Sequence, residues 1–132
     1  MTKISLAPLA FLLVLAGCGG GDGPALSEVE QLRARALAKE AEARSLAVDQ
    51  PCLLDMQCGA LSLKPTDAAC TYPAPKPYSL ISPTATQAEA AATQQRSYAT
   101  QLMNTNPPSV ICPAIAPAVP VVACEAQKCV LK

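Results

Sequence analysis

Six cysteines from position 52 onward constrain the fold of this chain more than any other feature. They are Cys52, Cys58, Cys70, Cys112, Cys124 and Cys129. Large aliphatic side chains are scarce, because the 115 residues after position 17 contain 21 Leu, Val and Ile and no Phe. That share lies below the roughly 20% under which chains tend not to fold. A stable domain therefore needs disulfide cross-links or a bound metal. Cysteines form disulfides in an oxidising compartment and more often bind metal in a reducing one, so the location of the protein matters.

The N-terminus indicates export. Lys3 supplies a positive charge, and residues 4–16 form an apolar run that only Ser5 and Pro8 interrupt. A transmembrane helix needs about 20 apolar residues, so this run is too short to span a bilayer. A charged start followed by a short apolar run is typical of a secretory signal, and we expect residues 1–17 to be removed.

The end of this run matches a lipid-attachment motif at every position. An aliphatic residue and two small residues precede a cysteine: Leu15, Ala16, Gly17 and Cys18. The motif resembles the lipobox of bacterial lipoproteins. The resemblance implies cleavage between Gly17 and Cys18, diacylglycerol on the Cys18 thiol and usually an acyl chain on the new amine. The alternative is an ordinary secretory signal that ends near a buried cysteine.

The lipobox resemblance also predicts where the protein resides. Two or three acyl chains hold a protein on a membrane almost permanently. Gly19 follows the lipidated residue, where an Asp often retains Gram-negative lipoproteins in the inner membrane. We therefore expect an anchor in the outer membrane facing the periplasm, rather than the inner membrane, with residues 18–25 as a flexible tether. The covalent lipid is the only cofactor-like group that we expect.

The six remaining cysteines then predict three disulfides, since their number is even and the bacterial envelope oxidises thiols. Fifteen pairings are possible, and the sequence does not choose among them. A zinc site is the alternative. It is disfavoured because the chain has no His and no Cys-x-x-Cys pair.

Residues 26–49 predict a helix. Ser27 and Glu30 form a capping box, and strong helix formers continue to about Val48. One narrow apolar stripe runs along it, made of Val29, Leu32, Ala36, Ala43 and Leu46. Because the centre of the stripe is alanine, this segment suits either light packing on the domain or a stalk above the membrane.

The cysteine-rich domain is expected over residues 50–132. Thr86 and Glu89 form a second capping box, which predicts a helix from Ala88 to about Met103. We predict a small α+β disulfide-rich domain, with an N-terminal helix, a short antiparallel sheet, one packing helix and much irregular Pro-rich chain.

Short strands complete this prediction. Residues 58–63 alternate as a strand does, and residues 121–124 and 129–131 flank a loop at 125–128 as a hairpin. The first strand is placed to add to the hairpin, with the second helix across the sheet. Residues 72–78 carry Pro at every second position, so we expect polyproline-like chain outside any strand ladder.

A second resemblance covers most of the chain after the signal. It rests on Pro51-Cys52, Asp55, Gln57-Cys58, Cys70, Tyr78-Ser79 and a terminal Cys-x4-Cys. These features are similar to a group of small proteobacterial lipoproteins of unassigned function. Thr71 and Tyr72 stand where that group has a Gly-rich turn, which puts the local backbone in doubt. The resemblance implies framework cysteines and no activity.

Residue types also exclude most catalytic mechanisms. Without His, there is no Ser/His/Asp or Cys/His arrangement and no His-ligated metal. Asp55 and Asp67 are the acids of the first cysteine region, and we expect both to be solvated turn residues rather than a catalytic pair. A redox role for Cys124 and Cys129 is disfavoured by the four residues between them. No catalytic or metal-ligating residue is therefore predicted.

These observations lead to a non-enzymatic hypothesis. We expect a lipid-anchored envelope protein that binds an unknown envelope protein or glycan, or supports an assembly. Nucleic acid is excluded as a partner, because nine basic side chains oppose ten acidic ones after residue 17. The alternative is an inhibitor of a protease or lysozyme, which needs a protruding loop such as 71–79. The least favoured hypothesis is a small envelope enzyme.

We predict that protein taken from the envelope contains no free thiol. Alkylation under denaturing conditions followed by intact-mass measurement counts free cysteines directly. Two or more alkylated cysteines would refute the framework of three disulfides.

Overall fold

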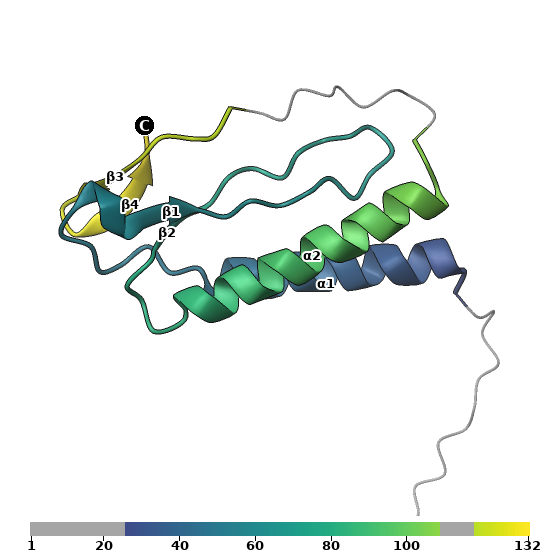
Figure 1. The fold of residues 1–132 in the computed structure, drawn as a ribbon, viewed down its shortest axis with the longest axis horizontal. Helices are drawn as coiled ribbons and strands as arrows, with labels where there is room; N and C mark the ends of the chain where they lie inside the picture. The colour runs from purple at the N-terminus through teal and green to yellow at the C-terminus, as the bar shows by residue number, and fades with distance from the viewer. Residues whose placement is uncertain (1–25, 109–117) are drawn as a thin grey trace, which may run out of the picture.

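The computed structural model of the protein describes residues 26–108 and 118–132. In chain order its elements are α1 (Glu28–Leu46), the 3-10 turn η1 (Asp55–Gln57), β1 (Cys58–Ala60), β2 (Pro77–Ser79), α2 (Ala85–Thr105), β3 (Val122–Glu125) and β4 (Lys128–Leu131). The two helices lie side by side, and all four strands gather at one end of the pair (Figure 1). The predicted small α+β disulfide-rich class is confirmed.

The predicted start of α1 is correct. The Ser27 backbone N–H donates to Glu30 Oε2 over 2.8 Å, and the Glu30 N–H donates to Ser27 Oγ over 3.3 Å, which completes the capping box. Leu32, Ala36 and Ala43 of the predicted stripe are buried. The helix ends at Leu46, a little before the predicted end.

The predicted start of α2 is wrong. The helix begins at Ala85, so Thr86 lies in its first turn and is not its N-cap. Thr84 occupies the N-cap position, and its hydroxyl donates to the Leu46 carbonyl at the end of α1 over 2.7 Å. That contact between distant residues fixes where α2 starts, whereas the capping pattern considers only local sequence.

Small side chains line the contact between the helices. The Thr84–Leu46 bond joins the end of α1 to the start of α2, so the two helices run antiparallel. The buried residues of α2 are mostly alanine: Ala85, Ala88, Ala91, Ala92 and Ala99. Ala36 and Ala43 are their counterparts in α1, with no exposed area. Alanine lets the helix backbones approach closely but buries little apolar area, so this core needs further cover.

The connection between β1 and β2 supplies that cover. Its first arm lies on α2, where Arg96 donates to the Ser62 carbonyl over 2.7 Å. Its second arm lies on α1, where the Arg44 guanidinium donates to the Ala74 carbonyl over 2.8 Å. Leu61 and Leu63 of the first arm are buried in the main apolar cluster with alanines of both helices. A long, largely irregular loop therefore forms the second layer of the domain.

The strands differ from the prediction in two respects. β1 stops at Ala60 and pairs with β2, although residues 72–78 were expected to lie outside any ladder. Pro77 is tolerated because it is the first residue of its strand, opposite Ala60. In addition, β1 and β2 form their own sheet instead of extending the C-terminal hairpin, and α2 packs mainly on α1 rather than across a sheet.

The C-terminal hairpin is confirmed, with a tighter turn than predicted. Glu125 pairs with Lys128 inside the ladder, which leaves Ala126 and Gln127 as the turn. Both turn residues have positive φ, 49° and 63°. Two consecutive residues with positive φ are typical of a type I′ turn, for which Asn-Gly is the usual signal. The sequence lacks that signal here.

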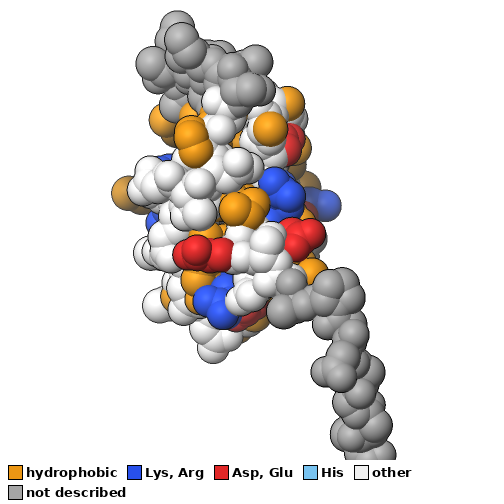
Figure 2. Space-filling model, turned by 90° about the vertical axis from the view of Figure 1, so that its right-hand side faces the viewer, with side chains coloured by type: hydrophobic (Ala, Val, Ile, Leu, Met, Phe, Trp, Pro, Cys, Tyr) orange, Lys and Arg blue, Asp and Glu red, His pale blue; other side chains and the backbone are white. Residues whose placement is uncertain are grey.

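The start of α1 lies at the end of the helix pair away from the strands (Figure 1). Figure 2 views this end, and acidic and basic side chains lie there among apolar and uncharged ones. None of the helices within the described ranges is long and apolar enough to cross a membrane.

Gln95 of α2 joins the two layers. It is fully buried, and it is the largest side chain of that kind in the described parts of the chain. Its Oε1 accepts from the Lys64 N–H over 3.0 Å, and its Nε2 donates to the Lys64 carbonyl over 2.7 Å. One amide thus satisfies both backbone groups of a residue in the covering loop.

We predict that Gln95→Ala lowers the free energy of unfolding by about 2 to 3 kcal/mol, since two hydrogen bonds are lost and two partly buried backbone groups lose their partner. Urea unfolding followed by circular dichroism measures the change. The exposed neighbour Gln94 is the matched control, and Gln94→Ala should stay within about 0.5 kcal/mol of the parent. Equal effects at the two positions would contradict this role for Gln95.

Candidate functional site

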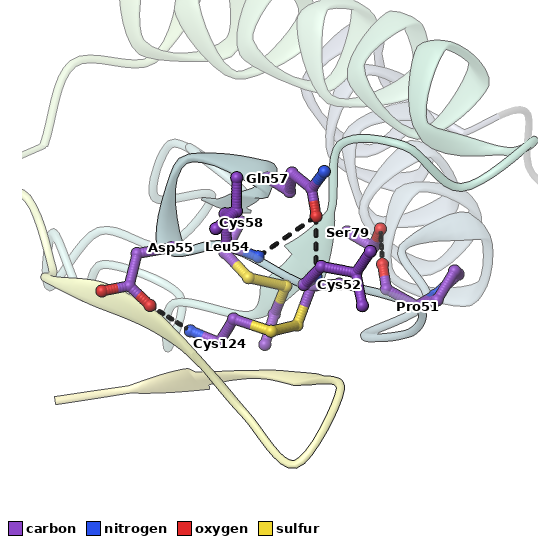
Figure 3. The surroundings of a disulfide bond; sticks show 10 residues. Pro51, Cys52, Leu54, Asp55, Gln57, Cys58, Ser79 and Cys124 are labelled. Atoms are coloured by element: carbon purple, nitrogen blue, oxygen red, sulfur yellow. Dashed lines mark hydrogen bonds between the residues drawn. A yellow bond between two sulfur atoms is a disulfide. The ribbon is translucent and has the colours of Figure 1, made fainter.

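Two disulfides cross-link the strand end of the domain. Cys52 bonds to Cys124 and Cys58 bonds to Cys129, with Cα–Cα distances of 5.9 and 5.5 Å. Cys124 and Cys129 lie directly opposite each other in the C-terminal hairpin. Each strand of the hairpin is therefore tied to the segment 52–58, and Figure 3 shows the two bonds side by side.

Hydrogen bonds reinforce this attachment. The Cys124 N–H donates to Asp55 Oδ1 over 2.8 Å, and the Cys129 N–H donates to the Asp49 carbonyl over 2.8 Å. Lys128 Nζ lies 3.2 Å from an Asp49 carboxylate oxygen. The apolar contacts of this region are the cysteines themselves with Val122, in a cluster separate from the helix core. The cross-links thus stand in for a hydrophobic core at this end.

Four of the six predicted disulfide cysteines are accounted for by these two bonds. Cys70 is disulfide-bonded as well. Cys112 lies outside the described residues, as do Gly17 and Cys18 at the predicted cleavage and lipidation site. The pairing of the third predicted disulfide therefore stays a prediction.

The cysteines also bear on metal binding and redox chemistry. Sulfur atoms of Cys52, Cys58 and Cys129 lie within 4.8 Å of one another, a spacing suited to a shared metal ion. All three are oxidised to disulfides, and zinc requires thiolates, so this oxidised form offers it no such ligands. Cys124 and Cys129 are bonded to different partners and not to each other.

Asp55 and Asp67, which were weighed as a catalytic pair, and Glu89 of α2 have separate surroundings. Asp55 binds the hairpin, whereas Asp67 Oδ1 accepts from the Thr71 N–H over 2.9 Å within its own turn. That backbone hydrogen bond is the main cause of the lowered pKa of the Asp67 carboxyl. Glu89 lies 3.0 Å from Arg96 on the surface of α2. No carboxylate pair forms among these three residues.

A group of exposed aliphatic side chains lies beside the disulfides. We name it the aliphatic tip, and it consists of Leu53, Leu54, Met56, Leu80 and Ile81. Their exposed fractions are 73%, 56%, 79%, 46% and 51%, respectively. Single exposed aliphatics are ordinary on protein surfaces, but five in two adjoining loops form a patch of the kind that marks interaction sites.

Gln57 holds the two loops of the aliphatic tip together. Its side-chain Oε1 accepts from the Leu53 and Leu54 N–H groups over 2.7 and 3.3 Å (Figure 3). Its backbone carbonyl accepts from the Leu80 N–H over 2.8 Å. Because Cys52 and Cys58 fix both ends of the first loop, its aliphatic side chains are presented on a cross-linked frame.

An apolar groove lies on the face formed by β1 and the chain leading into β3. Its volume is about 460 Å³. It is lined by residues 58–63 of the first arm and by Tyr72, Pro73, Val119 and Val122. The chain immediately before its 118–120 wall lies outside the described residues, so the aliphatic tip is the better-defined candidate.

The sequence analysis did not identify the aliphatic tip or Gln57. A signal was present, because Leu53, Leu54 and Met56 stand together between two cysteines only six positions apart. In a loop that short, both cysteines are committed to cross-links, so the intervening aliphatics have little room to turn inward. The position of Leu80 and Ile81 in the neighbouring loop could not be predicted from the sequence, since it depends on the β1–β2 pairing.

Comparisons with protein-family models, with curated proteins and with solved structures find no match to this chain.

We predict that reduction releases the C-terminal hairpin before the helix pair unfolds. A cross-link closing a loop of about 70 residues stabilises a domain by roughly 4 kcal/mol in the chain-entropy account, and the hairpin has little other apolar contact. Hydrogen exchange on reduced protein should show rapid exchange in residues 122–131 and retained protection in α1 and α2. Simultaneous loss of protection in all three would contradict this separation.

Proposed function

We propose that this chain is a lipid-anchored lipoprotein of the cell envelope whose disulfide-rich domain is a non-enzymatic binding or structural module. The observation that carries the binding role is the aliphatic tip, a solvent-exposed apolar surface on a cross-linked frame. The lipid role rests on the lipobox that ends at Cys18.

The disulfides support a location outside the cytosol. Structural disulfides persist in the periplasm and are rare where thioredoxin and glutathione keep thiols reduced. The two cross-links join residues 72 and 71 positions apart, so each closes a long loop that contains α2 rather than a short local loop. This agrees with an export signal at residues 1–17 and with an anchor in the outer membrane facing the periplasm.

Residue chemistry supports binding over catalysis. The chain has no His, and the carboxylates Asp55, Asp67 and Glu89 are each engaged in separate contacts. Tyr78 is buried, and that burial is the main cause of the raised pKa of its phenol, which keeps the hydroxyl protonated. The lipid on Cys18 is the only covalent group in the proposal.

The alternative function, inhibition of a protease or lysozyme, is less favoured. It requires residues 71–79 to protrude, but the second half of that segment lies against α1. The Lys76 ammonium donates to the Arg44 carbonyl over 2.5 Å, and β2 pairs with β1. Between the partner classes, the aliphatic tip favours a protein over a glycan, since it offers aliphatic surface and few polar groups.

Replacing the lipidated residue tests the anchor. Cys18→Ser should leave the full precursor uncut and without lipid, because the thiol is the acceptor for diacylglycerol. Intact mass and membrane fractionation provide the measurement. Gly19→Asp is the matched control, which should remain lipidated while moving toward the inner membrane. A Cys18→Ser protein that is still processed and membrane-bound would rule out the lipoprotein proposal.

A further inference from the structure

Cys70 has a disulfide partner that elimination narrows to two residues. It is buried and disulfide-bonded, and its N–H donates to the Asp67 carbonyl over 3.3 Å in the turn 67–71 of the β1–β2 connection. The chain has seven cysteines, and the other four within the described ranges bond to one another in two pairs. Cys18 and Cys112 are left, so the partner of Cys70 within the chain is one of them.

The end of α2 leads the chain to the residues just before Cys70. Pro108, which follows the helix, lines a small cavity of about 20 Å³ together with Asp67 and Ala68. Arg33 of α1 lines the same cavity, and its Nε donates to the Thr66 carbonyl over 3.4 Å. The chain therefore leaves the helix pair beside the turn that carries Cys70.

The described chain resumes beside the residues just after Cys70. Ala118 and Val119 line the apolar groove together with Tyr72 and Pro73. The two described ends of the connection from α2 to β3 thus flank the turn 67–71, one on each side of Cys70 in sequence.

This connection is short enough to bring Cys112 to the turn. Cys112 comes four residues after Pro108 and six before Ala118. An extended chain spans at most about 3.6 Å per residue, so the Cα of Cys112 lies within about 14 Å of that of Pro108 and about 22 Å of that of Ala118. Cys112 is therefore confined from both sides to the neighbourhood of Cys70.

Cys18 is the less suitable partner for two reasons. It lies eight residues before Leu26, the first described residue, and after the proposed cleavage it is a chain end held from one side only. A longer, one-sided tether gives its sulfur a lower effective concentration at Cys70. In addition, the proposed lipid occupies that sulfur, and disulfide exchange requires a free thiolate. This second reason rests on the proposed function.

We propose that Cys70 and Cys112 form the third disulfide of the domain, between the turn 67–71 and the chain that joins α2 to β3. The two thiols lose two protons and two electrons to a disulfide-bearing oxidant of the envelope, which leaves the exchange as a dithiol. The domain is then cross-linked by two bonds at the strand end and by one at the end of the β1–β2 connection away from the strands (Figure 1).

This bond gives the covering layer a covalent attachment. Within the described ranges, the hydrogen bonds from Gln95 and Arg44 hold the two arms of the β1–β2 connection to the helices. The third disulfide adds a cross-link at the turn between these arms. It also connects the two sides of the apolar groove, because Tyr72 follows Cys70 by two positions and Val119 follows Cys112 by seven.

Non-reducing fragment mapping of full-length protein from the envelope tests the pairing. Cleavage by Asp-N, at methionine and by thermolysin separates residues 67–103 from residues 104–120, and both from the other cysteines. Each of these two ranges contains one cysteine, Cys70 and Cys112 respectively. We expect mass spectrometry to find their fragments joined by a disulfide that reduction separates.

Cysteine variants provide a second readout. Cys112→Ala should expose one alkylatable thiol, on Cys70, and Cys70→Ala should expose one on Cys112, whereas Cys18→Ser should expose none. Each Ala variant should lower the Tm by roughly 10 to 20 °C, and the double variant no further, because both changes remove the same bond. Ser97→Ala, at an exposed position of α2, is the control and should lower the Tm by less than about 3 °C.

Three results would overturn the pairing. They are a link from Cys70 or Cys112 to any other cysteine, a link between two copies of the chain, or alkylation of both residues in the parent protein. A link between Cys70 and Cys18 would defeat the lipoprotein proposal as well, because a cross-linked sulfur carries no lipid. A Cys70–Cys112 bond in protein whose Cys18 carries no lipid would defeat the lipoprotein proposal alone and confirm the pairing.

Discussion

The paired disulfides between the segment 52–58 and the C-terminal hairpin are the constraint on which the strand end of this domain and its exposed loops depend. They join opposite strands of the hairpin to two cysteines that are close in sequence, so the hairpin can neither rotate nor slide against that segment. The same bonds fix both ends of the loop that carries Leu53, Leu54 and Met56. Cross-linking therefore provides the stability that aliphatic burial lacks here, and it also holds apolar side chains in solvent.

The helix pair is stabilised differently from the strand end, by a covering layer rather than by cross-links. Its interface is mostly alanine, which permits close packing but buries little area, and the domain compensates by laying the β1–β2 connection over both helices. Gln95 fixes one arm of this connection through the backbone of Lys64, and Arg44 fixes the other through Ala74. An irregular, proline-rich segment can form a layer because side chains of the helices satisfy its backbone groups.

Local signals in the sequence predicted much of this fold. The Ser27 capping box, the helical character of both long segments, the C-terminal hairpin and the engagement of Cys52, Cys58, Cys124 and Cys129 in disulfides could all be predicted. The start of α2, the pairing of Pro77–Ser79 with β1 and the role of Gln95 could not, because each depends on residues about 20 to 40 positions away. The aliphatic tip belongs to this second group, since its two loops are joined by the β1–β2 pairing and by hydrogen bonds between residues more than 20 positions apart.

The disulfide pairing is the central claim, and non-reducing peptide mapping tests it most directly. Chemical cleavage after Met56 separates Cys52 from Cys58, and trypsin cleavage after Lys128 separates Cys124 from Cys129. Asp-N cleavage before Asp67 separates Cys58 from Cys70, and thermolysin cleavage at Val121 or Val122 separates Cys112 from Cys124. This account predicts that mass spectrometry finds the Cys52 fragment linked to that of Cys124, and the Cys58 fragment linked to that of Cys129. Finding Cys52 joined to Cys129, or Cys52 joined to Cys58, would contradict it.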